Sequence, residues 1–134
     1  MILESEKKKL IELLNERNFD GVINYSKKLI EQNILDTDIF NVIGLAYQNL
    51  KYYEKSIDSF KKSIDLDNKN FQSLNNLAVS LKAINKLKLS VQTYKKCIKI
   101  KPDFMQSILN YANLKELINP DSEAINLYLD SLKI

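Results

Sequence analysis

The chain has 134 residues, of which 45% are hydrophobic and 28% charged, and a formal net charge of +3, which is typical of one globular domain. Its two glycines and two prolines are too few for a collagen-like, low-complexity or turn-rich β protein. It contains no histidine, which excludes catalytic triads that use imidazole and zinc sites that include it.

The N-terminal segment, Met-Ile-Leu-Glu-Ser-Glu-Lys-Lys-Lys, carries charges where a signal peptide needs an apolar run. No stretch approaches the ~18–20 apolar residues that span a bilayer. The single cysteine, Cys97, cannot form a disulfide within the chain. We therefore expect a cytoplasmic protein without a membrane span.

Similar units begin at positions 37, 71 and 105, and the constant spacing between these positions is called the repeat length below. When the chain is compared with itself at this shift, residue size is kept from unit to unit. Three such columns, two small and one aromatic, are Gly44, Ala78 and Ala112; Ser56, Ser90 and Ala124; and Phe60, Tyr94 and Tyr128. A period of this length indicates repeats that must stack on one another to bury their apolar faces.

Residues 3–36 are predicted to form a degenerate first unit. The apolar residues Leu10, Ile11 and Leu14 indicate a first helix, which fits the later units best after a shift of one residue. A second helix follows from about Phe19. Because terminal repeats are often atypical, we interpret this unit as an N-terminal cap.

The units 37–70 and 71–104 are the clearest helical hairpins, because apolar residues recur in each with helical spacing on both sides of a short turn. The small residues Gly44 and Ser56 are expected to let the two helices of their hairpin approach closely. The predicted helices are 37–50, 53–66, 71–84 and 87–100, and the turns are at Lys51-Tyr52 and Asn85-Lys86.

Residues 105–134 are predicted to form a third, incomplete unit of this kind. Its helices are expected at 105–118 and 121–133, joined at Asn119-Pro120, where asparagine tolerates the left-handed conformation that ends a helix. Ile125 and Leu132 occupy columns that are expected to face a following unit. We therefore expect an exposed apolar patch there, covered either by self-association through this hairpin or by further residues downstream.

At these positions the sequence resembles the tetratricopeptide repeat family over essentially its whole length. The residues that carry the resemblance are Phe40, Ile43, Gly44, Tyr47, Ser56, Phe60 and Ser63 in one unit, and Leu74, Leu77, Ala78, Ser90, Tyr94, Cys97 and Pro102 in the next. The resemblance implies an all-α solenoid of antiparallel helical hairpins in a right-handed superhelix. It also implies that the first helix of each hairpin lines the concave surface.

The segment Ser73-Leu74-Asn75-Asn76-Leu77-Ala78 is similar to the repeats of O-linked N-acetylglucosamine transferases and related bacterial proteins. The resemblance implies that Asn76, and Asn110 one unit later, bind peptide backbone in the groove. A carboxylate clamp of the kind that holds chaperone tails is not expected, because its lysine and arginine positions hold Gln72, Gln106 and Asn110.

The non-core faces of the first helices carry an amide-rich row. Amides donate and accept hydrogen bonds, so they can pair with the backbone of an extended peptide. The candidate groove residues are Asn41, Gln48, Gln72, Asn75, Asn76, Gln106, Asn110 and Asn113.

No catalytic constellation, metal site or cofactor site is expected. The carboxylates Asp36 and Asp38 lie at a unit boundary and are interpreted as residues of a helix end. Cys97 is interpreted as part of the core. The lysine-rich segment 82–101 is interpreted as a solvated outer face, although binding of anions there stays open. Nucleic acid is not expected as a partner, because Arg17 is the only arginine.

Besides this weaker possibility of anion binding, two functions remain open. The first is a non-enzymatic interaction scaffold that binds a peptide or a partner protein in the concave groove. The alternative is the N-terminal repeat region of a larger glycosyltransferase- or sulfotransferase-like enzyme, where the repeats recruit substrate or mediate oligomerisation.

Overall fold

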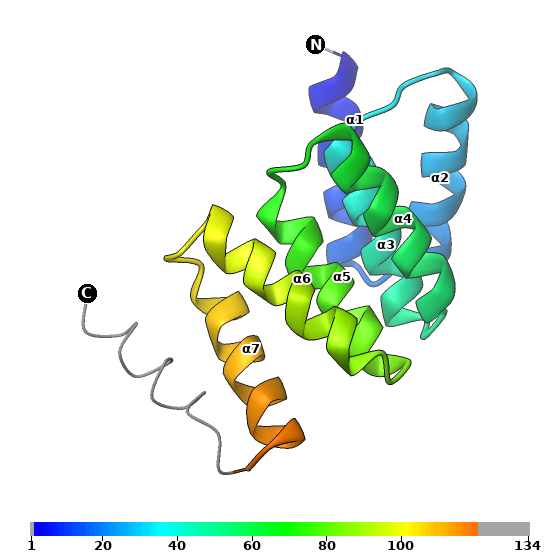
Figure 1. The fold of residues 1–134 in the computed structure, drawn as a ribbon. Coiled ribbons are helices and arrows are strands. Elements are labelled where there is room, and N and C mark those ends of the chain that lie inside the picture. The colour runs from blue at the N-terminus through cyan, green and yellow to red at the C-terminus, as the bar shows by residue number, and fades with distance from the viewer. Residues whose placement is uncertain (1, 121–134) are drawn as a thin grey trace.

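The computed structural model describes residues 2–120, which form seven α-helices and no strand (Figure 1). This part of the chain confirms the predicted all-α architecture. The helices are α1 (Ile2–Asn15), α2 (Phe19–Glu31), α3 (Thr37–Asn49), α4 (Tyr53–Leu66), α5 (Phe71–Ala83), α6 (Leu87–Ile100) and α7 (Met105–Ile118). None of these helices is long and apolar enough to cross a membrane.

The helices form two rows. Each helix packs against the next along the chain, and α1 also packs against α3, α3 against α5, and α5 against α7. Within the described residues, the backbones of α2, α4 and α6 lie further from one another. In a curved stack the more closely packed row lies on the inside. The odd-numbered helices therefore line the concave side of a helical solenoid, as predicted, and the even-numbered helices lie on its convex side.

The helix bounds follow the period of the sequence. The helices α4, α6 and α7 have the predicted bounds, and α3 and α5 end one residue earlier. Asn15 ends α1 and stands one repeat length before Asn49, which ends α3, so α1 is in register without the one-residue shift that its apolar pattern favoured. The predicted helix 121–133, with Ile125 and Leu132, lies outside the described residues.

The turn inside each complete hairpin has one residue in the left-handed conformation. Arg17, Lys51 and Asn85 have φ values of 59°, 65° and 64°, and each stands one repeat length from the next. Asn119 stands at the following position of this series, but its φ is −143°, so the prediction of a left-handed asparagine is wrong there. The reason is Pro120, whose ring restricts the residue before it to extended conformations.

Gly44 brings α3 and α4 together. The buried ring of Phe60 lies against it, and a Cβ atom at Gly44 would lie within 2.8 Å of three ring carbons. In the next hairpin Ala78 and Tyr94 occupy the same positions and belong to one buried cluster. The predicted packing role of the small residue is therefore confirmed at Gly44.

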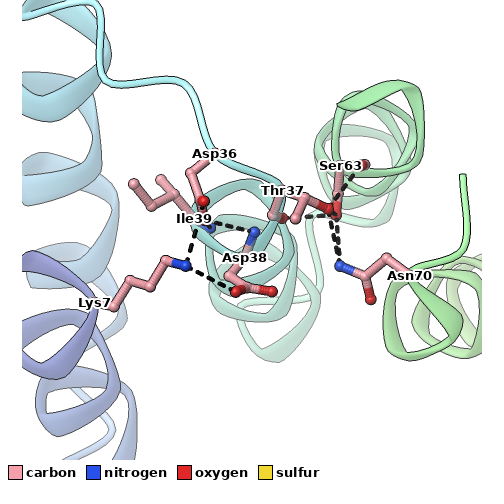
Figure 2. Close-up of polar contacts among 7 residues, drawn as sticks. All are labelled: Lys7, Asp36, Thr37, Asp38, Ile39, Ser63 and Asn70. Atoms are coloured by element: carbon pink, nitrogen blue, oxygen red, sulfur yellow. Dashed lines mark hydrogen bonds and ion pairs between the residues drawn. The ribbon is translucent and has the colours of Figure 1, made fainter. Parts of the chain in front are cut away.

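A buried polar cluster joins α3, α4 and α5 (Figure 2). The Ser63 hydroxyl donates to the Thr37 carbonyl at 2.7 Å, and the Thr37 hydroxyl donates to the Ser63 carbonyl at 2.8 Å. Asn70 Nδ2 donates to Thr37 Oγ1 at 2.9 Å, and Asn70 Oδ1 accepts from the backbone N–H of Ser73, which caps α5. The cluster satisfies polar groups that would be costly to bury alone.

Cys97 repeats the position of Ser63 one unit later. Its Sγ donates to the Phe71 carbonyl at 3.2 Å, and Phe71 stands one repeat length after Thr37. The thiol is fully buried, which confirms its interpretation as a core residue. Burial raises the pKa of the Cys97 thiol, although hydrogen bonds from its neighbours lower it in part.

We expect this thiol to make the fold sensitive to alkali. An unfolded thiol ionises near pH 8.5, whereas the native one keeps its proton to higher pH. The native state then binds more protons than the unfolded state, so the free energy of unfolding falls as pH rises above about 8.5, by at most about 1.4 kcal/mol per pH unit. In Cys97→Ser the free energy of unfolding should begin to fall only near pH 10. At that pH tyrosine ionises in the unfolded chain, whereas native Tyr94 keeps its proton because burial raises its pKa.

Urea unfolding of both proteins between pH 7 and pH 10 measures this difference. Serine is the matched replacement, because Ser63 makes the equivalent hydrogen bond in the preceding unit. Parallel pH profiles for the two proteins would contradict the expected role of the thiol.

Candidate functional site: a concave groove

A groove of about 550 Å³ opens on the concave side of the stack. It is formed by α1, α3 and α5, together with the start of α7. One wall is apolar and comes mainly from α1 and α3. Its residues are Leu10, Ile11, Leu14, Ile39, Val42 and Leu45, whereas Phe104 lines the groove at the start of α7. Leu10 is fully buried at the base of this wall, whereas the Ile11 side chain is 50% exposed and available to a ligand.

The other wall is polar and carries four of the predicted amides, Asn41, Gln72, Asn76 and Gln106. Gln72 and Gln106 are exposed and occupy the same position in successive units. Asn76 Nδ2 donates to Asn41 Oδ1 at 3.0 Å, which joins α5 to α3. That bond uses one of the two side-chain N–H groups of Asn76 and leaves its side-chain oxygen, Oδ1, to accept from a ligand.

The other four predicted amides do not line the groove. Asn75 is buried, with 1% of its surface exposed, and its Oδ1 accepts from Asn110 Nδ2 at 3.2 Å. Gln48 Nε2 donates to the Asn76 carbonyl and to Ser80 Oγ, so it joins α3 to α5. Asn113 is exposed and is not among the residues that line the groove. These side chains, Asn113 apart, connect repeats to one another.

An ion-pair cluster connects α1 to the start of α3 (Figure 2), and two of its residues, Lys7 and Asp38, line the groove at the end of the row that Asp38 forms with Gln72 and Gln106. Lys7 Nζ lies 3.0 Å from Asp38 Oδ2 and 3.3 Å from Asp36 Oδ2. Asp36 also caps α3, because its Oδ1 accepts from the backbone N–H groups of Asp38 and Ile39. Burial lowers the pKa of Lys7, but the hydrogen bonds and charges of the two carboxylates outweigh this effect and raise it overall.

The prediction of a helix-end role is therefore correct for Asp36, but incomplete. Both carboxylates also connect α1 to α3 through Lys7, a partner that the repeat pattern does not reveal. The apolar wall on α1 was likewise not predicted as part of the groove. The only available signal was the apolar spacing of Leu10, Ile11 and Leu14, which indicated a helix but not its packing partner.

The lysine-rich segment 82–101 lies largely on the convex side. Lys88, Lys95, Lys96 and Lys99 project from α6 and are exposed, which confirms their interpretation as an outer face. In residues 2–120, no group of three or more cysteine, aspartate or glutamate side chains is placed to hold a metal ion. The chemistry that the described residues offer in the groove is hydrogen bonding, apolar contact and one cluster of fixed charges.

The comparisons with known proteins agree on one architecture. The tetratricopeptide repeat family model matches residues 37–70 and 71–104. No curated protein sequence matches significantly. Among solved structures, the first TPR of Spaghetti (RPAP3) bound to the HSP90 peptide SRMEEVD is 13% identical, with a TM-score of 0.79, and the alignment covers 85% of this chain and 90% of that one.

Two further structures are similar. The second TPR domain of human RPAP3, in complex with the HSP70 peptide SGPTIEEVD, is 17% identical with a TM-score of 0.77, covering 83% of this chain and 92% of that one. MamA is 15% identical with a TM-score of 0.70, covering 95% and 83%. Likeness at these identities establishes the fold and not the ligand. Since the family model spans just over half of the 134 residues and the described helices form the same solenoid, the chain belongs to the tetratricopeptide repeat family.

Proposed function

We propose that the chain is a non-enzymatic interaction module that holds an extended peptide, or an extended segment of a partner protein, in its concave groove. The observation that carries this proposal is the groove itself, which is lined both by an apolar wall and by a row of amides. The similar folds of Spaghetti and RPAP3 were solved with bound peptides, which supports this use of the architecture.

The two walls suit the two parts of a peptide. An apolar side chain placed against Ile11 and its neighbours leaves water, which contributes about 25 cal/mol per Å² of buried apolar surface. The amides of Gln72, Asn76 and Gln106 then bond to the peptide backbone, whose N–H and C=O groups need partners once they leave water. With one buried cysteine, such a module also suits a reducing, cytoplasmic compartment.

Selection from a library of random peptides tests the proposal. Peptides selected on the wild-type chain are expected to bind the groove, so Ile11→Ser should weaken them. Ile11 is suitable because its exposed side chain contributes little to the core. Selected peptides that bind Ile11→Ser and the wild type equally well would place binding elsewhere and contradict the proposed function.

The double variant Gln72→Ala/Asn76→Ala should weaken binding of the same peptides while the fold persists. Each neutral hydrogen bond that is lost should cost about 0.5–1.5 kcal/mol of binding free energy, which is roughly two- to tenfold in Kd. Isothermal titration measures the loss, and Asn113→Ala is the matched control because that amide is exposed outside the groove. Asn110 is avoided, because its loss would leave buried Asn75 without a donor. Unchanged affinity in the double variant would contradict the role of the amides.

A further inference from the structure

The charges at one end of the groove indicate what kind of peptide it accepts. We propose that the groove selects an extended segment that places an apolar side chain against α1 and a lysine or arginine beside Asp38, and that it discriminates against acidic segments. This inference rests on the proposed function and adds a charge preference to it.

Among the described residues that line the groove, Lys7 is the only cation, and its charge is already compensated. Its Nζ contacts Asp38 Oδ2 at 3.0 Å and Asp36 Oδ2 at 3.3 Å, so two carboxylates surround one ammonium group. Together these three groups carry a net charge of −1. An acidic peptide would have to compete with both aspartates for Lys7, and it would meet amides along the rest of the polar wall.

Asp38 is the charge that a ligand can reach. Its side chain is 51% exposed, whereas that of Asp36 is 17% exposed and caps α3 through Oδ1. Figure 2 shows that Lys7 approaches Asp38 from the α1 side. The ion pair with Lys7 uses Asp38 Oδ2. Because Asp38 lines the groove, its other oxygen, Oδ1, is the one that a ligand can use. A peptide cation beside Asp38 would restore the charge balance at this end.

The position of Asp38 fixes where the cation lies relative to the other contacts. Asp38, Gln72 and Gln106 occupy the same place in three successive units, and all three line the groove. A segment that runs along this row meets one carboxylate and then two amides. The apolar side chain of the bound segment faces Ile11 and Val42. Ile11 lies one helical turn after Lys7 on α1, and Val42 lies one helical turn after Asp38 on α3.

The chain as a whole has the opposite charge. Its formal net charge is +3, and its convex side carries the exposed lysines of α6, so non-specific attraction favours acidic peptides. A preference of the groove for basic peptides would therefore have to arise locally, from Asp36 and Asp38. This contrast makes the inference easy to distinguish from background binding.

Three fluorescent peptides test the inference. They share an acetylated N-terminus, an amidated C-terminus and a core with two leucines, and they differ only in two flanking residues, which are lysine, glutamine or glutamate. Fluorescence anisotropy gives the affinity of each for the wild type, for Ile11→Ser and for three charge variants. Only binding that Ile11→Ser weakens is counted as groove binding, since acidic peptides can also meet the lysines of α6.

We expect the lysine peptide to bind the wild-type groove several-fold more tightly than the glutamate peptide, with the glutamine peptide between them. Asp38→Asn should reduce the ratio of the two affinities about two- to fivefold, the range for a half-exposed ion pair. Lys7→Gln should raise the ratio, because it leaves two carboxylates without their cation. Asp58→Asn, which removes an exposed acid from α4 outside the groove, should leave the ratio unchanged.

The inference is overturned if the glutamate peptide binds the groove as tightly as the lysine peptide, if the lysine peptide does not bind at millimolar concentration, or if Asp38→Asn leaves the ratio unchanged. If all three peptides bind equally and Ile11→Ser weakens their binding, the charge preference is overturned and the proposed function is kept. Binding of all three that Ile11→Ser does not affect would overturn both.

Discussion

Replacing Phe60 with alanine is expected to lower the free energy of unfolding by about 3–5 kcal/mol. The ring is completely buried and belongs to a cluster with Ile57, Leu77 and Leu81, so it joins α4 to α5 as well as to Gly44 of α3. Its removal deletes the largest side chain of that cluster and leaves a cavity that three helices would have to close. The loss is a large part of the total stability of a domain of this size.

Thermal and urea unfolding measure the effect, and the melting temperature should fall by about 10–20 °C. Tyr52→Ala is the matched control, because this aromatic side chain is 55% exposed. Its loss should change the free energy of unfolding by no more than about 0.5 kcal/mol. Similar losses in the two variants would mean that burial at the contact between α4 and α5 does not determine stability.

The fold could be predicted from the sequence because the period is carried by residue size rather than identity. In the units from residue 37 onward, the columns that contain Gly44 and Phe60 each hold one class of side chain, because a small residue lets a large ring pack between two helices. The same period placed the turns at Lys51 and Asn85. It did not predict the extended conformation of Asn119, because the local effect of the proline that follows is stronger than the preference of asparagine.

The first hairpin was harder to predict because it exchanges the two sizes. Leu10 stands one repeat length before Gly44, and Ser26 stands one repeat length before Phe60. Both side chains are fully buried, so a large residue on α1 and a small one on α2 replace the small and large residues of the next hairpin. A comparison of residue classes scores both columns as mismatches, although the register is the same.

The groove could be predicted only in part. Periodicity identified the amides of the concave side, but Asn75 and Asn76 are neighbours in sequence and differ by about 100° around α5. That rotation places Asn75 under the surface and Asn76 on it. The ion pairs of Lys7 depend on how α1 packs against α3, and no local pattern reports a contact between residues that are so far apart in the chain.

Gly44 provides a test in which a substitution should change sign with its neighbour. Alanine favours a helix by about 0.8–1.0 kcal/mol relative to glycine. At Gly44, however, the added Cβ would lie within 2.8 Å of the Phe60 ring, and overpacking of this kind costs about 1–3 kcal/mol. Gly44→Ala should therefore lower the free energy of unfolding, by up to about 2 kcal/mol.

In a Phe60→Leu background the same change should instead raise the free energy of unfolding, by up to about 1 kcal/mol. Two of the three ring carbons nearest to the new Cβ have no counterpart in leucine, and the leucine methyl groups can rotate away. Urea unfolding of the wild type, both single variants and the double variant gives the coupling free energy directly. A Gly44→Ala change that stabilises the wild type as much as the leucine variant would show that the ring can shift at no cost. In the next hairpin Ala78 and Tyr94 occupy the same positions in one buried cluster, so a Cβ beside the aromatic ring is accommodated there.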